Sequence, residues 1–273
     1  YSATLVILLF LIQICNENWH CIERNAYRIF IVILLFHLPV VLITAKQADD
    51  MLNNRIPTDG DDQEYQRFAI NLMHGIFWTN TIALPLETYN LDLTTEYGTE
   101  LKERYGYEGY ETFEKIDYFD LYRTPGFPLM LAMSYTVFGS NPLVARMMLG
   151  LCVWVTAILI LHTGKALKQQ YGLLAGFLTS VAFLQLFVFT GIVNLERILT
   201  EIPAVMWLTL FGLLITHYAH NPRRVLLVGA ALALTAAIFV RSNLLLVIPF
   251  LMLYVLWLRR NLFAPFLLAI IVG

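Results

Sequence analysis

Long apolar runs separated by short polar breaks dominate the second half of the chain. An α-helix needs about 20 apolar residues to cross the hydrocarbon core of a bilayer, and these runs approach that length. They cover residues 142–163, 172–193, 201–218, 225–240 and 243–258, with a similar earlier run at 27–45 and another beginning near residue 262. The pattern predicts an all-α protein built as a polytopic bundle of transmembrane helices.

The pattern changes between residues 46 and 123. Sixteen of the twenty acidic residues lie there against seven basic ones, so this segment carries a net charge of −9. The apolar segment that follows, residues 126–139, has about 14 residues and suits an interfacial or re-entrant helix better than a full crossing. We therefore expect residues 46–141 to form one large external loop that contains amphipathic and re-entrant helices.

Composition supports this division. The chain has 273 residues, of which 58% are hydrophobic and 14% charged, with a mean hydropathy of +0.65. Soluble domains carry about a quarter charged residues, so an ordinary soluble domain is excluded. The bilayer is the expected surrounding, and we expect no nucleic-acid partner. Cys15, Cys21 and Cys152 give neither a disulfide framework nor a metal-ligand spacing.

The two ends of the sequence predict that the chain is a fragment. It begins at Tyr1 and stops inside the apolar run "FLLAIIVG". Residues 1–26 form an uncertain N-terminal segment in which 3–15 is a candidate extra span. The first transmembrane helix is then expected at 27–45 and the remaining ones within 142–273, the last of them truncated.

Basic residues in the short loops predict the orientation, because such loops are enriched in lysine and arginine on the cytoplasmic side. The pairs are Arg24 and Arg28, Lys165 and Lys168, Arg223 and Arg224, and Arg259 and Arg260. If these pairs are cytoplasmic, the acidic loop lies outside. Glu196, Arg197, Glu201 and Arg241 then fall at the outer ends of spans, where they either mark a site or extend to the lipid headgroups.

The stretch "DGDDQEYQRFAINLMHG", residues 59–75, predicts a short amphipathic helix. Tyr65, Phe68, Ala69 and Leu72 are apolar at the i, i+3, i+4, i+7 spacing of one helix face. Gly75 follows at the position where a glycine often closes a helix.

The acids of this stretch have three interpretations. Asp61 followed by Glu64 is an aspartate version of the capping box, which predicts Asp61 as the N-cap. Asp59, Asp61 and Asp62 offer oxygen ligands to a divalent metal, although Ile70 stands where a twelve-residue calcium loop needs glutamate. A carboxylate at a helix start is also a candidate general base. The pattern alone does not choose among these roles.

A second block surrounds Arg123. Pro125 and Pro128 fix φ in the sequence Thr-Pro-Gly-Phe-Pro, and Gly126 permits a tight turn. A rigid turn that holds one arginine suits phosphate, which guanidinium binds through two parallel hydrogen bonds. The alternative is an ion pair with a nearby acid. Nearby tyrosines fit an interfacial belt or a sugar-stacking surface; they are Tyr105, Tyr107, Tyr110, Tyr118 and Tyr122.

Two further blocks are "NLERILTEIPAVMWLTL" (194–210) and "VRSNLLLVIPFL" (240–251). Glu201 begins a span, where the helix dipole favours an acid. Arg241 closes another span, where a long cation reaches the headgroups. Neither residue is specific for a function by itself.

Taken in order, the four blocks resemble the GT-C superfamily of polyprenyl-phosphate-sugar-dependent glycosyltransferases, in the branch of protein O-mannosyltransferases and lipid A aminoarabinose transferase. The first block matches an Asp four residues before a Tyr (Asp61, Tyr65), then "A-x-N-L-x-x-G", which includes Asn71 and Gly75. The other blocks match "R-x-P-x-x-P-L" (Arg123 to Leu129), "T-E" (Thr200-Glu201) and an arginine before "P-F-L" (Arg241). The resemblance covers about residues 27–260.

The resemblance implies a GT-C-like fold and a sugar transfer at the extracytoplasmic face of a bacterial inner or plasma membrane. Asp61 would take a proton from an acceptor hydroxyl on a protein, lipid or glycan, and Asp62 and Glu201 would orient base or acceptor. The donor is a polyprenyl-phosphate-linked sugar. Cations would neutralise its departing phosphate; the candidates are Arg123, Arg241, Lys102, Arg104 and Lys115. No cofactor is certain, and a divalent metal stays open.

Two other functions remain in view. A transporter or flippase with an acidic external domain is one, although such proteins bind near the midplane at broken helices. Here the acids lie away from the centres of the spans. The other is an inactive homologue that serves as a scaffold, since a fold does not by itself imply activity.

Overall fold

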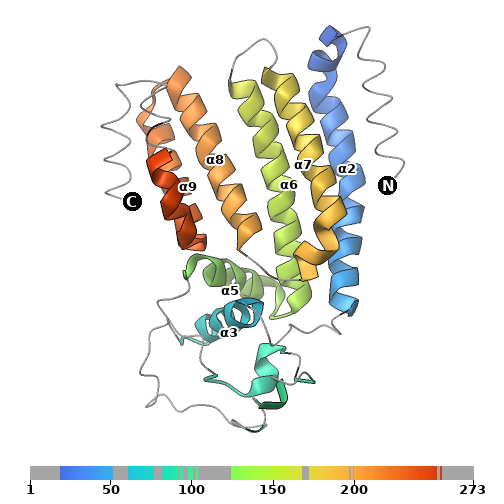
Figure 1. The fold of residues 1–273 in the computed structure, drawn as a ribbon, viewed down its shortest axis with the longest axis vertical. Coiled ribbons are helices and arrows are strands. Elements are labelled where there is room, and N and C mark those ends of the chain that lie inside the picture. The colour runs from blue at the N-terminus through green and yellow to red at the C-terminus, as the bar shows by residue number, and fades with distance from the viewer. Residues whose placement is uncertain are drawn as a thin grey trace.

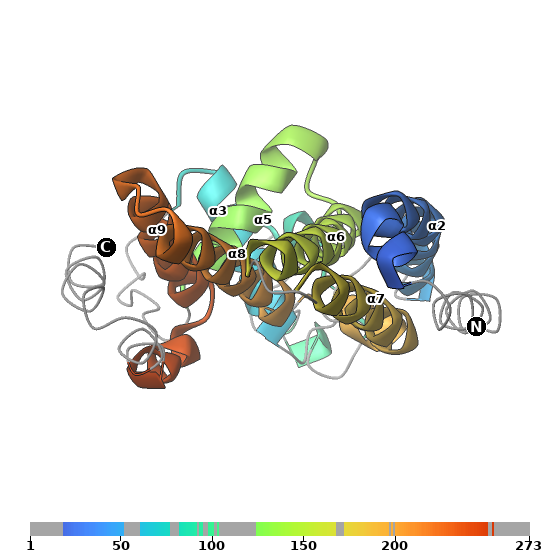
Figure 2. The same cartoon turned by 90° about the horizontal axis from the view of Figure 1, so that it is seen from above.

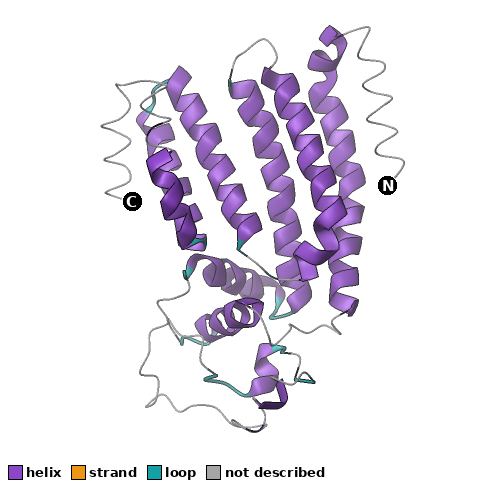
Figure 3. Cartoon of the chain, in the orientation of Figure 1, coloured by secondary structure: helices purple, strands orange, loops and turns teal. Residues whose placement is uncertain are grey.

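The computed structural model describes the chain in several stretches, and all helix assignments below refer to them. They are residues 19–51, 61–76, 82–91, 93–94, 98–100, 103, 124–167, 172–196, 198, 200–250 and 253. Within them the regular structure is helical, with no β-strand (Figure 3). The all-α prediction is therefore confirmed for the described residues.

Five long helices run side by side and form a bundle (Figures 1 and 2). They are α2 (Trp19–Met51), α6 (Pro142–Ala166), α7 (Gly172–Glu196), α8 (Glu201–His220) and α9 (Arg224–Val240). Successive helices alternate in direction, so the end of α2, the start of α6, the end of α7, the start of α8 and the end of α9 share one end of the bundle. We call this end the α3/α5 end, after the two helices that lie against it.

The helix bounds agree with the sequence pattern. The helices α6, α7, α8 and α9 match the predicted spans to within three residues at either end. The helix α2 extends beyond the predicted 27–45 at both ends, because it begins at Trp19 and continues through polar residues to Met51. The predicted span at 243–258 begins as the 3₁₀ helix η3 (Ser242–Val247) and is helical to Phe250. The candidate spans at 3–15 and near 262 lie outside the described residues.

Three of the described helices are long and apolar enough to cross a membrane, at Asn25–Asp50, Pro142–Ala166 and Glu201–His220. Shorter apolar helices occur at Gly172–Phe187 and Arg224–Val240. The outer face of α2 carries large apolar side chains that are more than half exposed; they are Ile31, Val32, Leu35, Phe36 and Ile43. An apolar face of this size is unfavourable in water. These features indicate a protein embedded in lipid.

Two short helices lie across the α3/α5 end of the bundle (Figure 1). The helix α5 (Gly126–Phe138) packs on α6 and α9, and α3 (Asp61–Met73) packs on α5 and on the 3₁₀ helix η1 (Leu86–Tyr89). The segment 126–139 is thus a 13-residue helix beneath the bundle and not a further member of it. The helix α3 packs on the side of α5 that faces away from the long helices.

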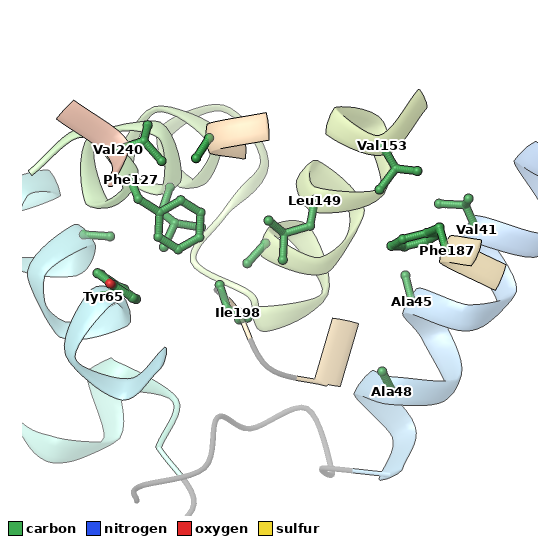
Figure 4. Packing of buried hydrophobic residues seen from close by; sticks show 14 of the residues in the cluster. Val41, Ala45, Ala48, Tyr65, Phe127, Leu149, Val153, Phe187, Ile198 and Val240 are labelled. Atoms are coloured by element: carbon green, nitrogen blue, oxygen red, sulfur yellow. The ribbon is translucent and has the colours of Figure 1, made fainter. Parts of the chain in front are cut away.

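One apolar core joins these short helices to the long ones. The rings of Tyr65 and Phe127 meet edge to face, with centroids 5.1 Å apart. From there the core continues through Leu149 of α6 to Phe187 of α7 and Val41 of α2 (Figure 4). A second cluster around Phe211 joins α8 to α9. The position of α3 therefore depends on the packing of α5 against the bundle.

Gly126 makes the closest contact between α5 and the bundle. A Cβ atom at this position would lie 2.5 Å from the carbonyl oxygen of Phe239 and 2.8 Å from the amide nitrogen of Val240. Both atoms belong to the backbone of the last turn of α9, so no side-chain rotation relieves the clash. Glycine is required here because the two backbones touch.

We expect Gly126→Ala to lower the free energy of unfolding by about 1–3 kcal/mol, since the added methyl group forces α5 away from α9. Gly212→Ala is the matched control, because a Cβ atom at Gly212 in α8 meets nothing within 4 Å. Thermal unfolding of both variants in the same detergent measures the difference. Equal stability of the two variants would contradict the close contact.

Candidate functional site

The helix α3 begins at Asp61 itself, with Asp61, Asp62 and Glu64 in its first turn. The capping-box prediction placed Asp61 just before the helix; residue 60 lies outside the described part of the chain, so the N-cap role of Asp61 stays a prediction. The acid stays favourable there, because the free N–H groups and the positive end of the helix dipole also reach the first turn. Asp61 is exposed. Asp62 is only 2% exposed, and its Oδ1 accepts a hydrogen bond from the Gln63 amide (3.2 Å).

The other end of α3 closes as predicted at Gly75. Its φ is +77°, a left-handed conformation that glycine adopts without strain. The Gly75 amide donates to the Leu72 carbonyl (3.1 Å) and the Ile76 amide to the Asn71 carbonyl (2.9 Å). These two bonds form a Schellman motif. The prediction that Gly75 is the C′ residue is confirmed.

Asn71 fixes the loop that follows. The Tyr89 hydroxyl donates to Asn71 Oδ1 (2.7 Å) and accepts from the amides of Ala83 (2.9 Å) and Leu84 (3.0 Å). Tyr89 is fully buried, and burial raises its pKa above the usual value. This motif asparagine therefore has a structural role: it ties α3 to η1.

The Thr-Pro-Gly-Phe-Pro block connects α5 to the end of α9. The Thr124 hydroxyl donates to the Val240 carbonyl (2.9 Å), one of the carbonyls that the end of a helix leaves without an intrahelical partner. Pro125 precedes the helix with φ −79°, and Pro128 lies in the first turn, where the missing N–H costs nothing. Thr124, which follows Arg123, is thus hydrogen-bonded to Val240, which precedes Arg241.

Arg241 also contacts the start of α8. Its Nη1 forms an ion pair with Glu201 and donates to Thr200 Oγ1 (3.3 Å). The side chain of Arg241 is 33% exposed and that of Glu201 51% exposed, so solvent weakens their attraction. Three sequence blocks therefore meet at the α3/α5 end: Thr200-Glu201, Arg241 directly after α9, and the Thr-Pro-Gly-Phe-Pro block. At this end α5 in turn packs against α3.

A group of buried polar side chains on α2, α3, α5 and α6 was not predicted from the sequence. Arg146, one turn into α6, is fully buried and forms an ion pair with Asp49 near the end of α2. The Tyr135 hydroxyl of α5 donates to Gln66 of α3, and both side chains are buried. Burial raises the pKa of Tyr135 far above its usual value. One signal was present in the sequence: an arginine inside an apolar span needs a partner.

Several predicted site residues lie outside the described part of the chain. They are Asp59, Lys102, Arg104, Lys115, Arg123 and Arg197, together with the five tyrosines of the acidic loop. Among the described residues, no group of three or more histidine, cysteine, aspartate or glutamate side chains forms a metal site. The metal interpretation of Asp59, Asp61 and Asp62 stays a prediction.

The chain was compared with models of protein families, with curated proteins and with solved structures. None of the three comparisons gave a match. The argument for a function therefore depends on the residues and their arrangement.

We expect the protein to lose stability as the pH rises above about 10, the ordinary pKa of tyrosine. Tyr89 and Tyr135 have raised pKa values in the folded state, so the unfolded chain releases their protons first. The stabilisation that depends on neutral hydroxyls is therefore present below pH 10 and is lost as the pH increases. Thermal unfolding from pH 7 to 11 measures this loss, which the double variant Tyr89→Phe/Tyr135→Phe should reduce. An identical pH dependence in the double variant would contradict it.

We expect Arg241→Gln and Glu201→Gln each to change the free energy of unfolding by less than about 1 kcal/mol, because the pair is partly exposed. Chemical denaturation in mixed micelles provides the measurement. A loss of several kcal/mol in either variant would show that the pair has a mainly structural role.

Proposed function

We propose that the chain is an integral-membrane glycosyltransferase that moves a sugar from a polyprenyl-phosphate donor to a hydroxyl acceptor. The observation that carries the proposal is the gathering of separate sequence blocks at one end of the bundle. Thr124 bonds to Val240, Arg241 pairs with Glu201, and α5 holds α3 with Asp61 at its start. Blocks that resemble the GT-C enzymes in sequence are therefore neighbours in space.

Asp61 acts as the general base in this mechanism. Asp61 is an exposed residue, as a base that meets an acceptor hydroxyl has to be. The acceptor proton moves to Asp61, the acceptor oxygen bonds to the anomeric carbon, and the bond from that carbon to the donor phosphate oxygen breaks. The electron pair of that bond leaves with the polyprenyl phosphate. The positive end of a helix dipole favours a carboxylate in the first turn, and burial by a bound acceptor makes a carboxylate a stronger base.

Arginines neutralise the departing phosphate, since charge develops there in the transition state. Arg241 contacts both Glu201 and Thr200 through Nη1, which leaves its other edge for phosphate oxygens. Arg123 precedes Thr124 and is the second candidate, followed by the loop cations Lys102, Arg104 and Lys115. Glu201 orients Arg241 and the acceptor.

The position of the charged groups favours this function over a transporter. The ion pairs Lys46–Asp50, Asp49–Arg146 and Glu201–Arg241 lie towards the α3/α5 end of the bundle. Transporters place such groups near the midplane, at broken helices. We place the α3/α5 end at the extracytoplasmic face of a bacterial plasma membrane, where the donor enters from the lipid and the acceptor from the aqueous side.

We expect Asp61→Asn to lower the rate of sugar transfer by about a hundredfold or more, the usual contribution of a general base. Transfer from a radiolabelled polyprenyl-phosphate sugar to membrane acceptors by the purified full-length protein is the measurement. Glu64→Gln is the matched control, because it removes one charge from the same helix turn. Full activity of Asp61→Asn, or equal losses in both variants, would exclude Asp61 as the base.

A further inference from the structure

The turn between α8 and α9 carries a basic surface at the end of the bundle opposite the α3/α5 end (Figure 1). Arg223 and Arg224 are consecutive residues at the start of α9, and His217 and His220 lie in the last turn of α8. All four residues, which we call the basic turn, are exposed. The proposed sugar transfer takes place at the other end of the bundle and does not use them.

The two arginines have no acidic neighbour along their own helices. The sequence from residue 202 to 240, which covers almost all of α8 and α9, contains neither aspartate nor glutamate. Glu201 lies at the opposite end of α8, where it pairs with Arg241. Within the described part of the chain, neither Arg223 nor Arg224 forms an ion pair or a side-chain hydrogen bond. Their positive charge is therefore available to a partner outside the chain.

An exposed apolar stripe on α9 begins directly after the arginines. Val225, Val228 and Leu232 are 81%, 58% and 62% exposed, and Phe239 further along is 44% exposed. Residues three, four or seven apart lie on the same face of a helix, so these four side chains form one stripe. The other side of α9, which includes Ala233, is buried against α8. In a protein embedded in lipid, the apolar stripe therefore faces acyl chains.

A basic turn at the end of an apolar stripe matches the two parts of a phospholipid. The arginines lie where the apolar surface stops, which is the depth of the headgroups. Basic residues at this depth attract anionic lipids, and guanidinium binds phosphate oxygens through two parallel hydrogen bonds. A soluble acidic partner would use the arginines but not the stripe. An anionic phospholipid accounts for both features.

We propose that the basic turn binds the phosphate headgroup of an anionic phospholipid whose acyl chain lies along the apolar stripe of α9. Arg223 and Arg224 bind the phosphate, and the rings of His217 and His220 offer further N–H donors. The lipid belongs to the leaflet at this end of the bundle, which is the cytoplasmic leaflet in the orientation proposed above. The inference does not depend on the proposed sugar transfer.

The test measures lipid binding by the purified full chain in a neutral detergent. Native mass spectrometry gives the affinity for phosphatidylglycerol, which is anionic, and for phosphatidylcholine with the same acyl chains, which has no net charge. We expect the wild type to bind phosphatidylglycerol about tenfold more tightly or better. Arg223→Gln/Arg224→Gln should abolish most of this preference, because each basic residue near a headgroup contributes about fivefold to the affinity.

Arg28→Gln/Lys165→Gln is the matched control, because it removes two exposed cations from α2 and α6 at the same end of the bundle. The Lys165 ammonium group lies 4.9 Å from the centre of the Tyr27 ring, so it already has a partner. This variant should keep the preference for phosphatidylglycerol. Equal losses in the two double variants would overturn the proposal, because the preference would then come from surface charge in general. A wild type without any preference would also overturn it.

Two further measurements test the charge and the acyl chain separately. Arg223→Lys/Arg224→Lys keeps both charges and should keep most of the preference, whereas a loss as large as that of the glutamine variant would contradict the electrostatic attraction. Glycerol phosphate, a soluble headgroup without acyl chains, should not displace phosphatidylglycerol from the wild type at equal concentration. Displacement by it would show a site for free anions and would overturn the assignment to a lipid.

Discussion

The buried charge of Arg146 constrains how α2 and α6 meet at the α3/α5 end. A guanidinium inside an apolar helix needs a partner, and Asp49 supplies it only if α2 continues past its apolar stretch to Met51. The pair thereby joins α2 to α6 at this end. The helix α5 packs on α6 and on α3, so the end of α6 that carries this pair also contacts the helix on which α3 rests.

The length of α5 is a second constraint. With 13 residues it is too short to cross a bilayer, so its apolar side has to be covered in another way. Phe127 and Leu131 are buried, with α6, α9 and α3 packed on the helix, whereas Met133 and Val137 on the opposite side are more than half exposed. The helix thus has a protein-facing side and an apolar outer side, which fits a position at the membrane surface. The contacts of Thr124 and Gly126 with α9 hold it there.

Local patterns were sufficient to predict α6 to α9 and the C-terminal end of α3, but not the full length of α2. Apolar length gave the bounds of α6 to α9, and a glycine after an amphipathic stripe gave the C-terminus of α3 at Gly75. The partners across the fold were not predictable in this way. Arg146 and Asp49 are 97 residues apart, and Tyr135 and Gln66 are 69 apart. Their pairing depends on how α5 lies under the bundle, and a one-dimensional pattern of polar and apolar positions does not contain that information.

Asp61 and Asp62 show why adjacent acids need not share a role. Neighbouring residues of a helix are about 100° apart around its axis, so one carboxylate can face the buried cluster while the next faces solvent. Asp62 is buried and Asp61 is exposed. The buried acid is inaccessible to a substrate, whereas the exposed acid is accessible. If one of the two accepts a proton from a hydroxyl, accessibility selects Asp61.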